Sequence, residues 1–253
     1  MNLDEREKQW LLDEKYGGKD CPEYQEDLKK LQAGEPLAYV IGTMPFLDCV
    51  IHLESRPLIP RPETEYWTHK VIQEIGETSV NVLDIFAGSG CVGIAVAKHC
   101  PHAHVTFAEL KPKHCDQIVK NLAKNEVKSS QYRVINSDVF GSIPNQQFDY
   151  ILANPPYISK KRLDTVQSSV IDYEDPDALF TDDEGLYFVK RLLVEAEHYL
   201  KSTGALYIEF DPWQTEILTP LLEQQSLWQW EYLQDQYQKD RVLVLTKITT
   251  GNQ

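Results

Sequence analysis

The 253-residue sequence has no long hydrophobic run. No stretch approaches the roughly 18 consecutive apolar residues that a membrane-spanning helix requires. The opening residues, MNLDEREKQWLLDEKY, are charged from the start and lack the apolar centre of a signal peptide. We therefore expect a cytoplasmic protein with no membrane segment.

Cysteine is also scarce, and the cysteines do not form a recognisable framework. The five residues stand at scattered positions: Cys21, Cys49, Cys91, Cys100 and Cys115. An odd number at such spacing indicates free thiols in a reducing compartment. The segment KHCPHAHVTFAELKPKHC is rich in histidine but contains no CxxC pair, and His104 falls at the start of a predicted strand. It is therefore more typical of polar loops at helix ends than of a zinc site, and we expect no metal.

Positive charge is the third deficit. Lysine and arginine total 25 against 39 aspartates and glutamates, for a net charge of -14. A bare phosphate backbone would repel such a chain, so broad nucleic-acid binding is unexpected. With 42% hydrophobic residues, the chain can form one large domain, or one domain with a small appendage.

The N-terminal quarter differs in pattern from the rest. Residues 4–16 and 21–34 are predicted to be helices, and residues 35–59 a β-hairpin. Pro57, Pro60 and Pro62 then fix an extended connector before a helix at 63–75. We expect residues 1–62 to form a short helical and hairpin linker region that docks the substrate, and residues 63–253 to form the catalytic domain.

Strands and helices alternate from residue 80 onward. The strands are predicted at 80–86, 104–110, 131–138, 148–154, 205–210, 227–235 and 241–247, and the helices at 91–100, 112–125, 185–200 and 212–225. Gly204 is expected to stop the third of these helices. The pattern predicts an α/β fold with a doubly wound, mostly parallel sheet. The last two strands have no helix between them, which indicates an antiparallel edge.

A glycine-rich loop follows the first of these strands, in VLDIFAGSGCVG. Gly88, Gly90 and Gly93 spell GxGxxG, a weak dinucleotide fingerprint. However, Asp84 at the strand end would repel a pyrophosphate. It would instead attract a cation, such as the amino group or sulfonium of S-adenosylmethionine.

Other polar and apolar residues follow the next strands. Glu109 is placed to accept hydrogen bonds from a ribose diol. Asp138 is the third acid along this edge. Val139 and Phe140 beside it are candidates for packing on adenine, with ordinary core packing as the alternative.

The segment LANPPYIS places Asn154, Pro155, Pro156 and Tyr157 at the end of the fourth strand. The Asn154 carboxamide oxygen can accept a hydrogen bond from a substrate amino group. The prolines stiffen the backbone, so that a main-chain carbonyl can face the same group, and Tyr157 offers a flat face. These features fit a planar amine or amide nitrogen that is oriented for methyl transfer.

Together, LDIFAGSG and ILANPPYI resemble class I methyltransferases that modify planar nitrogen atoms. The upstream GEPLAYVIGTMPFLDCVIHLESRPLIPRPETEYW closely resembles the linker and hairpin of the release-factor glutamine methyltransferases. The downstream VIDYEDPDALFTDDEGLYFVKRLL, YIEFDPWQTEIL and DRVLVL match that family's later blocks in order. The resemblance covers residues 31–247 and implies a seven-stranded Rossmann-like methyltransferase sheet.

The resemblance also implies roles for particular residues. By position, the family's cofactor contacts fall on Phe86, Ala87, Gly88, Ser89, Gly90, Glu109, Val139 and Asn154. Asp84, Asp138 and Phe140 are further cofactor candidates because of their places at the strand ends. Catalytic and substrate contacts fall on Asn154, Pro155, Pro156 and Tyr157, and Arg61, Pro62, Glu63 and Thr64 shape the wall of the site. Phe86 departs from the usual glycine and Val139 from an aromatic of some members. The N-terminal helical region is shorter than is usual in the family.

The implied activity is methylation of the glutamine in the Gly-Gly-Gln loop of a peptide-chain release factor by S-adenosylmethionine. We expect a monomer that contacts no nucleic acid directly. The alternatives are a nucleic-acid exocyclic-amine (adenine or guanine) methyltransferase and a non-catalytic interaction protein. The negative charge argues against the first, and Asp84, Glu109 and Asn154 argue against the second.

Overall fold

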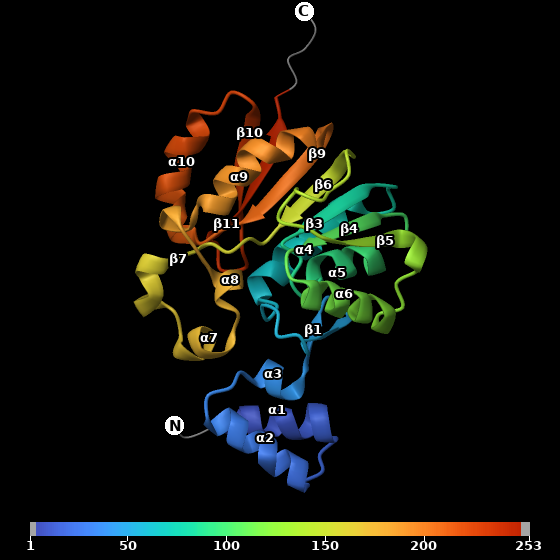
Figure 1. Cartoon of the computed structure of the whole chain (residues 1–253), viewed down its shortest axis with the longest axis vertical. Helices are drawn as coiled ribbons and strands as arrows, with labels where there is room; N and C mark the ends of the chain where they lie inside the picture. The colour runs from blue at the N-terminus through green and yellow to red at the C-terminus, as the bar shows by residue number, and fades with distance from the viewer. Residues whose placement is uncertain (1–3, 249–253) are drawn as a thin grey trace, which may run out of the picture.

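A twisted seven-stranded sheet forms the centre of the structure, a computed structural model that describes residues 4–248. Its strand order is β10-β11-β9-β6-β3-β4-β5. The bounds are β3 Asn81–Ile85, β4 His104–Glu109, β5 Tyr132–Asn136, β6 Phe148–Ala153, β9 Leu200–Glu209, β10 Trp228–Gln234 and β11 Asp240–Lys247. Figure 1 shows these strands as one layer between two layers of helices.

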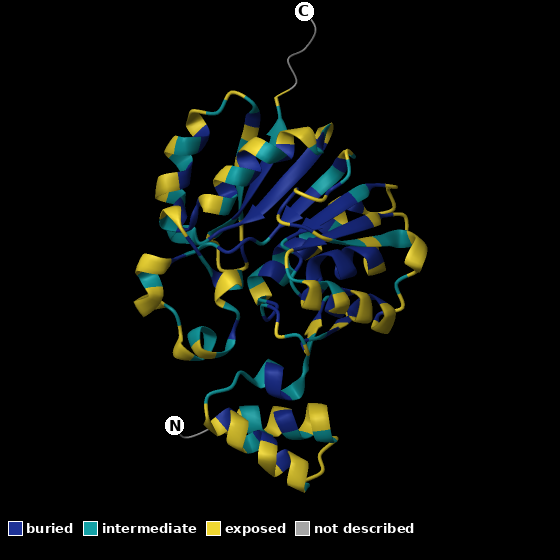
Figure 2. Cartoon of the chain, in the orientation of Figure 1, coloured by how far each residue is buried: buried dark blue, intermediate teal, exposed yellow. Residues whose placement is uncertain are grey.

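Two apolar cores lie on opposite faces of this sheet. One face packs on α4 (Pro62–Ile75), α5 (Cys91–His99) and α6 (Pro112–Lys124). The other packs on α9 (Tyr187–Glu195) and α10 (Thr215–Glu223). The central strands are buried on both sides, as Figure 2 shows, because helices cover both faces of a doubly wound sheet. The predicted fold class is confirmed.

Strand direction follows the predicted division. Strands β9, β6, β3, β4 and β5 run parallel to one another, whereas β11 pairs antiparallel with β9 and β10 pairs antiparallel with β11. From β3, the chain first adds β4 and β5 on one side of the sheet and then adds β6 and β9 on the other side. The direction in which strands are added therefore reverses next to β3. Ligands bind outside the carboxyl ends of the strands at such a switch point.

The N-terminal helices form a separate small cluster. The chain begins with α1 (Glu5–Tyr16), α2 (Pro22–Gln32) and α3 (Leu37–Ile41), whose shared core contains Leu11, Tyr24, Leu31 and Val40. Figure 1 shows α1 and α2 below the hairpin and away from the sheet. Helix α3 lies where the sequence predicted only a hairpin.

The hairpin itself is shorter than predicted. Strand β1 (Thr43–Phe46) pairs antiparallel with β2 (Cys49–His52), and a turn followed by an irregular segment replaces the predicted pairing up to residue 59. Phe46, Cys49 and Ile51 are buried in the core of the sheet together with α4 and α5. The hairpin therefore packs as part of the larger body, while the division into residues 1–62 and 63–253 stays a prediction.

The predicted helix over residues 185–200 also needs correction. Helix α9 ends at Glu195, a single 3-10 turn (Ala196–His198) follows, and β9 already begins at Leu200. Gly204 lies inside this strand at an irregularity opposite β6, where an added Cβ would come within 2.8 Å of the Asp149 carbonyl oxygen. The glycine thus permits a close strand approach rather than a helix stop.

The segment between β6 and α9 contains short elements that the sequence did not predict. They are β7 (Ile158–Ser159), a 3-10 segment (Lys160–Thr165), α7 (Ser168–Tyr173), α8 (Pro176–Leu179), β8 (Phe180–Thr181) and a 3-10 turn (Asp183–Gly185). Another 3-10 turn (Pro212–Gln214) precedes α10, and one (Ser129–Gln131) precedes β5. Within residues 4–248, no helix is both long and apolar enough to cross a membrane.

Candidate active site

Three neighbouring cavities open at the carboxyl ends of the parallel strands, and Asn154 lines all of them. The largest, of about 360 Å³, also contacts Tyr157, Arg61 and Arg241. A second, of about 90 Å³, contacts Phe86, Gly88, Glu109 and Val139. A third, of about 30 Å³, contacts Asp84, Thr64 and Ser89. We call the 360 Å³ space the outer cavity and the 90 Å³ space the inner cavity.

The glycine loop between β3 and α5 is fixed by Asp84. The Asp84 Oδ2 accepts a hydrogen bond of 2.8 Å from the backbone N–H of Gly93. An added Cβ at Gly93 would lie 2.4 Å from the Phe107 ring and 2.8 Å from Asp84 Oδ2, so only glycine allows this approach. Burial raises the pKa of Asp84 to about 8, against the opposing effect of the Gly93 donor.

Phe86 adopts a backbone conformation that favours glycine. Its φ is +62°, which costs a side-chain-bearing residue about 1 kcal/mol or more. The Phe86 ring makes an edge-on contact with Phe188 of α9, at 5.0 Å between ring centroids. The loop therefore keeps the conformation of a glycine loop, and the aromatic contact offsets part of the strain.

Glu109 is held at the end of β4 by two backbone donors. The N–H of Lys111 donates to Oε1 at 2.8 Å, and the N–H of Gly88 donates to Oε2 at 2.9 Å. Each carboxylate oxygen retains a second lone pair, as hydrogen bonds from a diol would require. Burial raises the pKa of Glu109.

The residues after β5 lie at different depths. Val139 is buried and lines the inner cavity, with a φ of +48° that is strained for a β-branched residue. Asp138 also lines the cavity, and its Oδ1 accepts a hydrogen bond from Arg191. Phe140 instead stacks on Tyr199 in the core, at 4.5 Å between ring centroids, and lines none of the three cavities of the site.

Helix α6 joins the glycine loop to the hairpin through side-chain amides. Asn121 accepts from the N–H of His52 and donates to the carbonyl oxygens of His52 and Ser89. Asn125 makes the same pair of bonds to Val50 but does not bond the loop. These side-chain amides form hydrogen bonds with the backbone N–H and C=O groups on the open edge of β2, as a neighbouring strand would.

His114 lies on the same face of α6 and lines the inner cavity. Its Nδ1 is 2.8 Å from the Ser55 hydroxyl, and burial lowers the pKa of its imidazole to about 4. It is therefore neutral at neutral pH. Within residues 4–248, no cluster of three or more potential ligand side chains is placed to hold a metal ion.

Lys111 joins two parts of the inner cavity wall through ion pairs. Its ammonium group forms ion pairs with Asp175 and Asp177 at the start of α8. All three residues line the cavity. The segment after the Asn-Pro-Pro-Tyr motif thereby covers the inner cavity.

The Asn154 carboxamide presents an unpaired acceptor. Its Oδ1 is buried, and it is the single buried side-chain nitrogen or oxygen atom without a partner in the described part of the chain. Its Nδ2 donates to the Thr64 hydroxyl at 3.2 Å. An unpaired buried acceptor costs about 1–3 kcal/mol, so it indicates a group that receives a donor from a ligand.

The other residues of the Asn-Pro-Pro-Tyr motif also line the cavities. Pro155 and Pro156 are buried, Pro155 facing the outer cavity and Pro156 the inner one. Tyr157 lines the outer cavity and donates to Glu209 Oε1 at 3.3 Å. The carbonyl oxygen of Tyr157 accepts a hydrogen bond from Gln214, which fixes this turn.

Of the residues that were predicted to form the wall of the site, some line a cavity and others do not. Arg61 lines the outer cavity and forms an ion pair of 2.6 Å with Glu174, a buried residue that also accepts from the N–H of Ile59. Glu63 is partly exposed and lines none of the three cavities. The Arg162 guanidinium lies 4.4 Å over the Trp213 ring at the outer cavity, a contact that the sequence did not predict.

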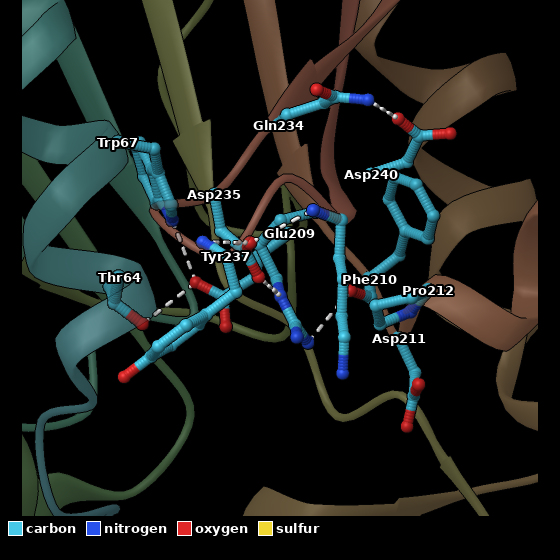
Figure 3. A network of polar contacts seen from close by, with 12 residues as sticks. Thr64, Trp67, Glu209, Phe210, Asp211, Pro212, Gln234, Asp235, Tyr237 and Asp240 are labelled. Atoms are coloured by element: carbon cyan, nitrogen blue, oxygen red, sulfur yellow. Dashed lines mark hydrogen bonds and ion pairs between the residues drawn. The ribbon is translucent and has the colours of Figure 1, made fainter.

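Glu209 is the main residue that the sequence reasoning missed. It ends β9 and is buried, and its Oε2 accepts 2.7 Å hydrogen bonds from Thr64 Oγ1 and Trp67 Nε1. Figure 3 shows Thr64 and Trp67 of α4 both directed at this carboxylate. The available signal was a lone acid at the end of the apolar strand ALYIEF.

Comparisons with solved structures agree with this architecture. A ribosomal protein L11 methylase from Lactobacillus delbrueckii subsp. bulgaricus superposes with a TM-score of 0.55 at 14% identity, covering 77% of this chain and 82% of that one. A T. thermophilus 16S rRNA N2 G1207 methyltransferase, solved with AdoMet and guanosine, gives 0.54 at 19% identity, covering 81% and 49%. At these identities the likeness shows the fold alone.

Sequence comparisons are more specific. Residues 67–174 match the family model described as the methyltransferase small domain. With the glycine loop and the Asn154 site, these findings define the chain as a methyltransferase with a Rossmann-like fold.

Curated relatives identify the branch of that class. The release factor glutamine methyltransferase of Streptococcus pneumoniae is 34% identical over 228 residues, 88% of this chain and 79% of its own length. That of Lactococcus lactis is 30% identical over 246 residues, 96% and 90%. The chain belongs to the release factor glutamine methyltransferase family.

Proposed function

We propose that the chain methylates the side-chain amide nitrogen of the Gly-Gly-Gln glutamine in a peptide-chain release factor, with S-adenosylmethionine as the methyl donor. The observation that carries the proposal is the buried, unpaired Oδ1 of Asn154 at the junction of the cavities. Family membership supplies the substrate class.

The residues around the inner cavity fit this cofactor. Glu109 has free lone pairs for the ribose hydroxyls, and Val139 presents an apolar surface to the adenine. Asp84 in the 30 Å³ cavity presents a carboxyl group to the amino group, and the positive charge of a bound cofactor would favour its ionised form. Phe86, Ala87, Gly88 and Ser89 of the glycine loop line the 30 Å³ cavity, and Gly90 joins this loop to α5. When bound, the cofactor supplies a methyl group on a sulfonium, which is electrophilic without help from an acid.

The substrate amide would enter from the outer cavity. Asn154 Oδ1 accepts one N–H of the glutamine amide, and the stiffened backbone at Pro155 and Pro156 directs a carbonyl at the other. Tyr157 packs against the planar group. This arrangement aims the weakly nucleophilic nitrogen at the methyl carbon, and the nitrogen loses its extra proton after transfer.

Docking of the release factor is assigned to the N-terminal helices and the segment facing them. Val170 of α7 lines the outer cavity, and Tyr173 at the end of the same helix donates to the carbonyl oxygen of Ala33. Arg56 pairs with Glu35, so the chain around residues 33–35 is joined to the segments that lead to the cavity. We further propose that the enzyme acts as a cytoplasmic monomer.

The direct test uses labelled S-adenosylmethionine with a release factor and with its variant in which the Gly-Gly-Gln glutamine is replaced by alanine. Label and a mass increase of one methyl group are expected only on the unmodified motif. Equal labelling of both proteins contradicts the proposal. Label in RNA or DNA instead of the release factor would support the nucleic-acid alternative.

A further inference from the structure

The Asn154 carboxamide has two orientations of nearly the same shape, and only one of them suits the proposed reaction. With Oδ1 facing the cavities, it accepts a hydrogen bond from the substrate NH2 group. With the amide rotated by 180°, its own NH2 would face the substrate NH2, and two donors would oppose each other. Something in the protein must select the first orientation.

Thr64 is the immediate neighbour that can make this selection. A hydroxyl has one proton to donate, and the Thr64 proton is directed to Glu209 Oε2 at 2.7 Å. Only lone pairs of Thr64 Oγ1 therefore remain for Asn154, 3.2 Å away. The amide must present its Nδ2 to Thr64, which leaves Oδ1 facing the cavities.

Glu209 fixes the direction of the Thr64 proton. An ionised carboxylate only accepts hydrogen bonds, and this one receives donors from Thr64 and Trp67 on Oε2 and from Tyr157 on Oε1. All three donors favour the ionised form, but burial has the larger effect and raises the pKa of Glu209. Trp67 Nε1–H can only donate, so Oε2 acts as an acceptor for it in either form of the carboxyl group.

The fold places these groups together through neighbouring strands. Ala153 of β6 is in register with Ile208 of β9, so Asn154 and Glu209 are the next residues on adjacent parallel strands. Helix α4 supplies both Thr64 and Trp67 from one face. Strands β6 and β9 and helix α4 thus bring Asn154, the proposed substrate-binding residue, close to the buried carboxylate of Glu209.

We propose that Glu209 and Thr64 are positioning residues that hold the Asn154 carboxamide oxygen toward the substrate amide. Glu209 sets the Thr64 hydroxyl, and Thr64 sets the Asn154 amide. The same carboxylate holds the Tyr157 hydroxyl, so one buried charge organises both polar groups of the motif. The proposal rests on the proposed function for its consequence in catalysis, but not for the geometry.

The decisive pair of variants is Thr64→Val and Thr64→Ser. Valine keeps the shape but removes the hydroxyl, and we expect kcat to fall about 30-fold or more, with the Kd for S-adenosylmethionine changed by less than about threefold. Serine keeps the hydroxyl and is expected to retain kcat within about fivefold. Equal losses in both variants, or an unchanged kcat in Thr64→Val, overturn the proposal.

Thr68→Val is the matched control. Thr68 is buried on the same helix, but its hydroxyl donates to the backbone oxygen of Thr64 and reaches neither Glu209 nor Asn154. The same isosteric change there is expected to leave kcat within about threefold. A loss as large as that of Thr64→Val would mean that kcat responds to any lost hydroxyl on α4, and would overturn the proposal.

A second pair tests the carboxylate. Glu209→Gln keeps an oxygen that can accept from Thr64 and Trp67, whereas Glu209→Met offers only a weakly accepting sulfur. We expect the methionine variant, if folded, to lose about as much kcat as Thr64→Val, and the glutamine variant to lose less. A methionine variant with near wild-type kcat overturns the role of Glu209.

A substrate-free measurement separates failure of this proposal from failure of the proposed function. Side-chain NH2 exchange of Asn154, followed by NMR in isotopically labelled protein, is expected to be slow in the wild type and in Thr64→Ser. It should be at least about tenfold faster in Thr64→Val, where Nδ2 has lost its partner. Equal exchange rates in all three proteins overturn the proposed positioning of Asn154 by Thr64, whether or not a release factor is methylated. Absence of release-factor labelling with protected exchange would contradict the proposed function alone.

Discussion

The two sides of Asn154 are built in different ways. The inner cavity and the 30 Å³ cavity are organised mainly by backbone donors at most 21 positions from their acceptors: Gly93 for Asp84, and Gly88 and Lys111 for Glu109. The outer side depends on side chains far apart in the chain, such as Tyr157 with Glu209 and Arg61 with Glu174.

This difference separates two tasks. Backbone donors at strand ends are fixed once the sheet forms, so they suit a cofactor whose shape does not change. Long-range side-chain pairs are set by tertiary packing and can be altered without moving the loop. We therefore expect changes on the outer side to affect kcat, and changes on the inner side to affect cofactor affinity.

The largest effect is expected for Asn154→Ala, which removes the acceptor for the substrate amide. We expect kcat to fall on the order of 100-fold or more, because the oriented hydrogen bond is lost. The Kd for S-adenosylmethionine should change by less than about fivefold. Single-turnover rates and calorimetry measure the two quantities, and equal losses in both would break the comparison.

A smaller but distinct effect is expected for Asn121→Ala compared with Asn125→Ala. Each substitution removes a pair of bonds to β2, and each should lower the free energy of unfolding by about 2 kcal/mol. Only Asn121 also bonds the Ser89 carbonyl oxygen. We therefore expect Asn121→Ala alone to weaken cofactor binding, by roughly tenfold.

Denaturation and calorimetry on both variants check this pair. An unchanged kcat at saturating cofactor in both variants would support the expectation that inner-side changes affect cofactor affinity rather than kcat. Cofactor affinity that falls equally in the two variants would show that the hairpin, rather than the loop contact, determines binding.

The Asp84 carboxyl predicts a pH dependence of stability. Its folded pKa of about 8 exceeds the unfolded value of 3.8, so between pH 4 and 8 the folded protein retains a proton that the unfolded chain has lost. The contribution of Asp84 to the free energy of unfolding therefore falls as pH rises through this window, by up to about 1.4 kcal/mol per pH unit.

Asp84→Asn keeps an acceptor for the Gly93 N–H and cannot ionise. We expect its cofactor-free unfolding free energy to depend less steeply on pH than that of the wild type, and its affinity for the cationic cofactor to be lower. Urea denaturation at several pH values between 4 and 8 measures the slopes. Parallel curves for the two proteins would contradict the assigned ionisation.

The smallest effect is expected for Phe86→Gly. Relief of the φ of +62° is offset by the lost contact with Phe188 and by the greater chain entropy of glycine. The free energy of unfolding should change by less than about 1 kcal/mol. Thermal or chemical denaturation checks this, and a loss above about 2 kcal/mol would mean that the aromatic contact outweighs the strain.

Local patterns predicted most of the sheet and its helices. Strand β3, helix α5 and helix α6 lie within a residue or so of their predicted ranges, because buried apolar runs and proline or glycine boundaries are local signals. Helix α3 was missed because it has only five residues, and Gly204 was misinterpreted because its role is a close approach between strands.

The candidate site divides in the same way. Asp84, Glu109 and Asn154 were found because each follows an apolar strand, and parallel strands end at one edge of the sheet. Phe140 shows the limit of this reasoning, since only packing decided that its ring stacks on Tyr199. Glu209 stands at the end of an apolar strand in the same way, but nothing local showed that α4 would surround it, and Asn121 carried no local signal that distinguished it from other polar residues on its helix.

By itself, the sequence determined the alternating α/β order, the glycine loop and the Asn-Pro-Pro-Tyr turn, because these depend on side-chain periodicity and on backbone freedom within a few residues. Only the tertiary structure decided which way the Asn154 amide points and which groups join the hairpin to the loop. Those features depend on hydrogen bonds between residues more than 30 positions apart, whose direction is settled only when burial leaves each donor with one acceptor.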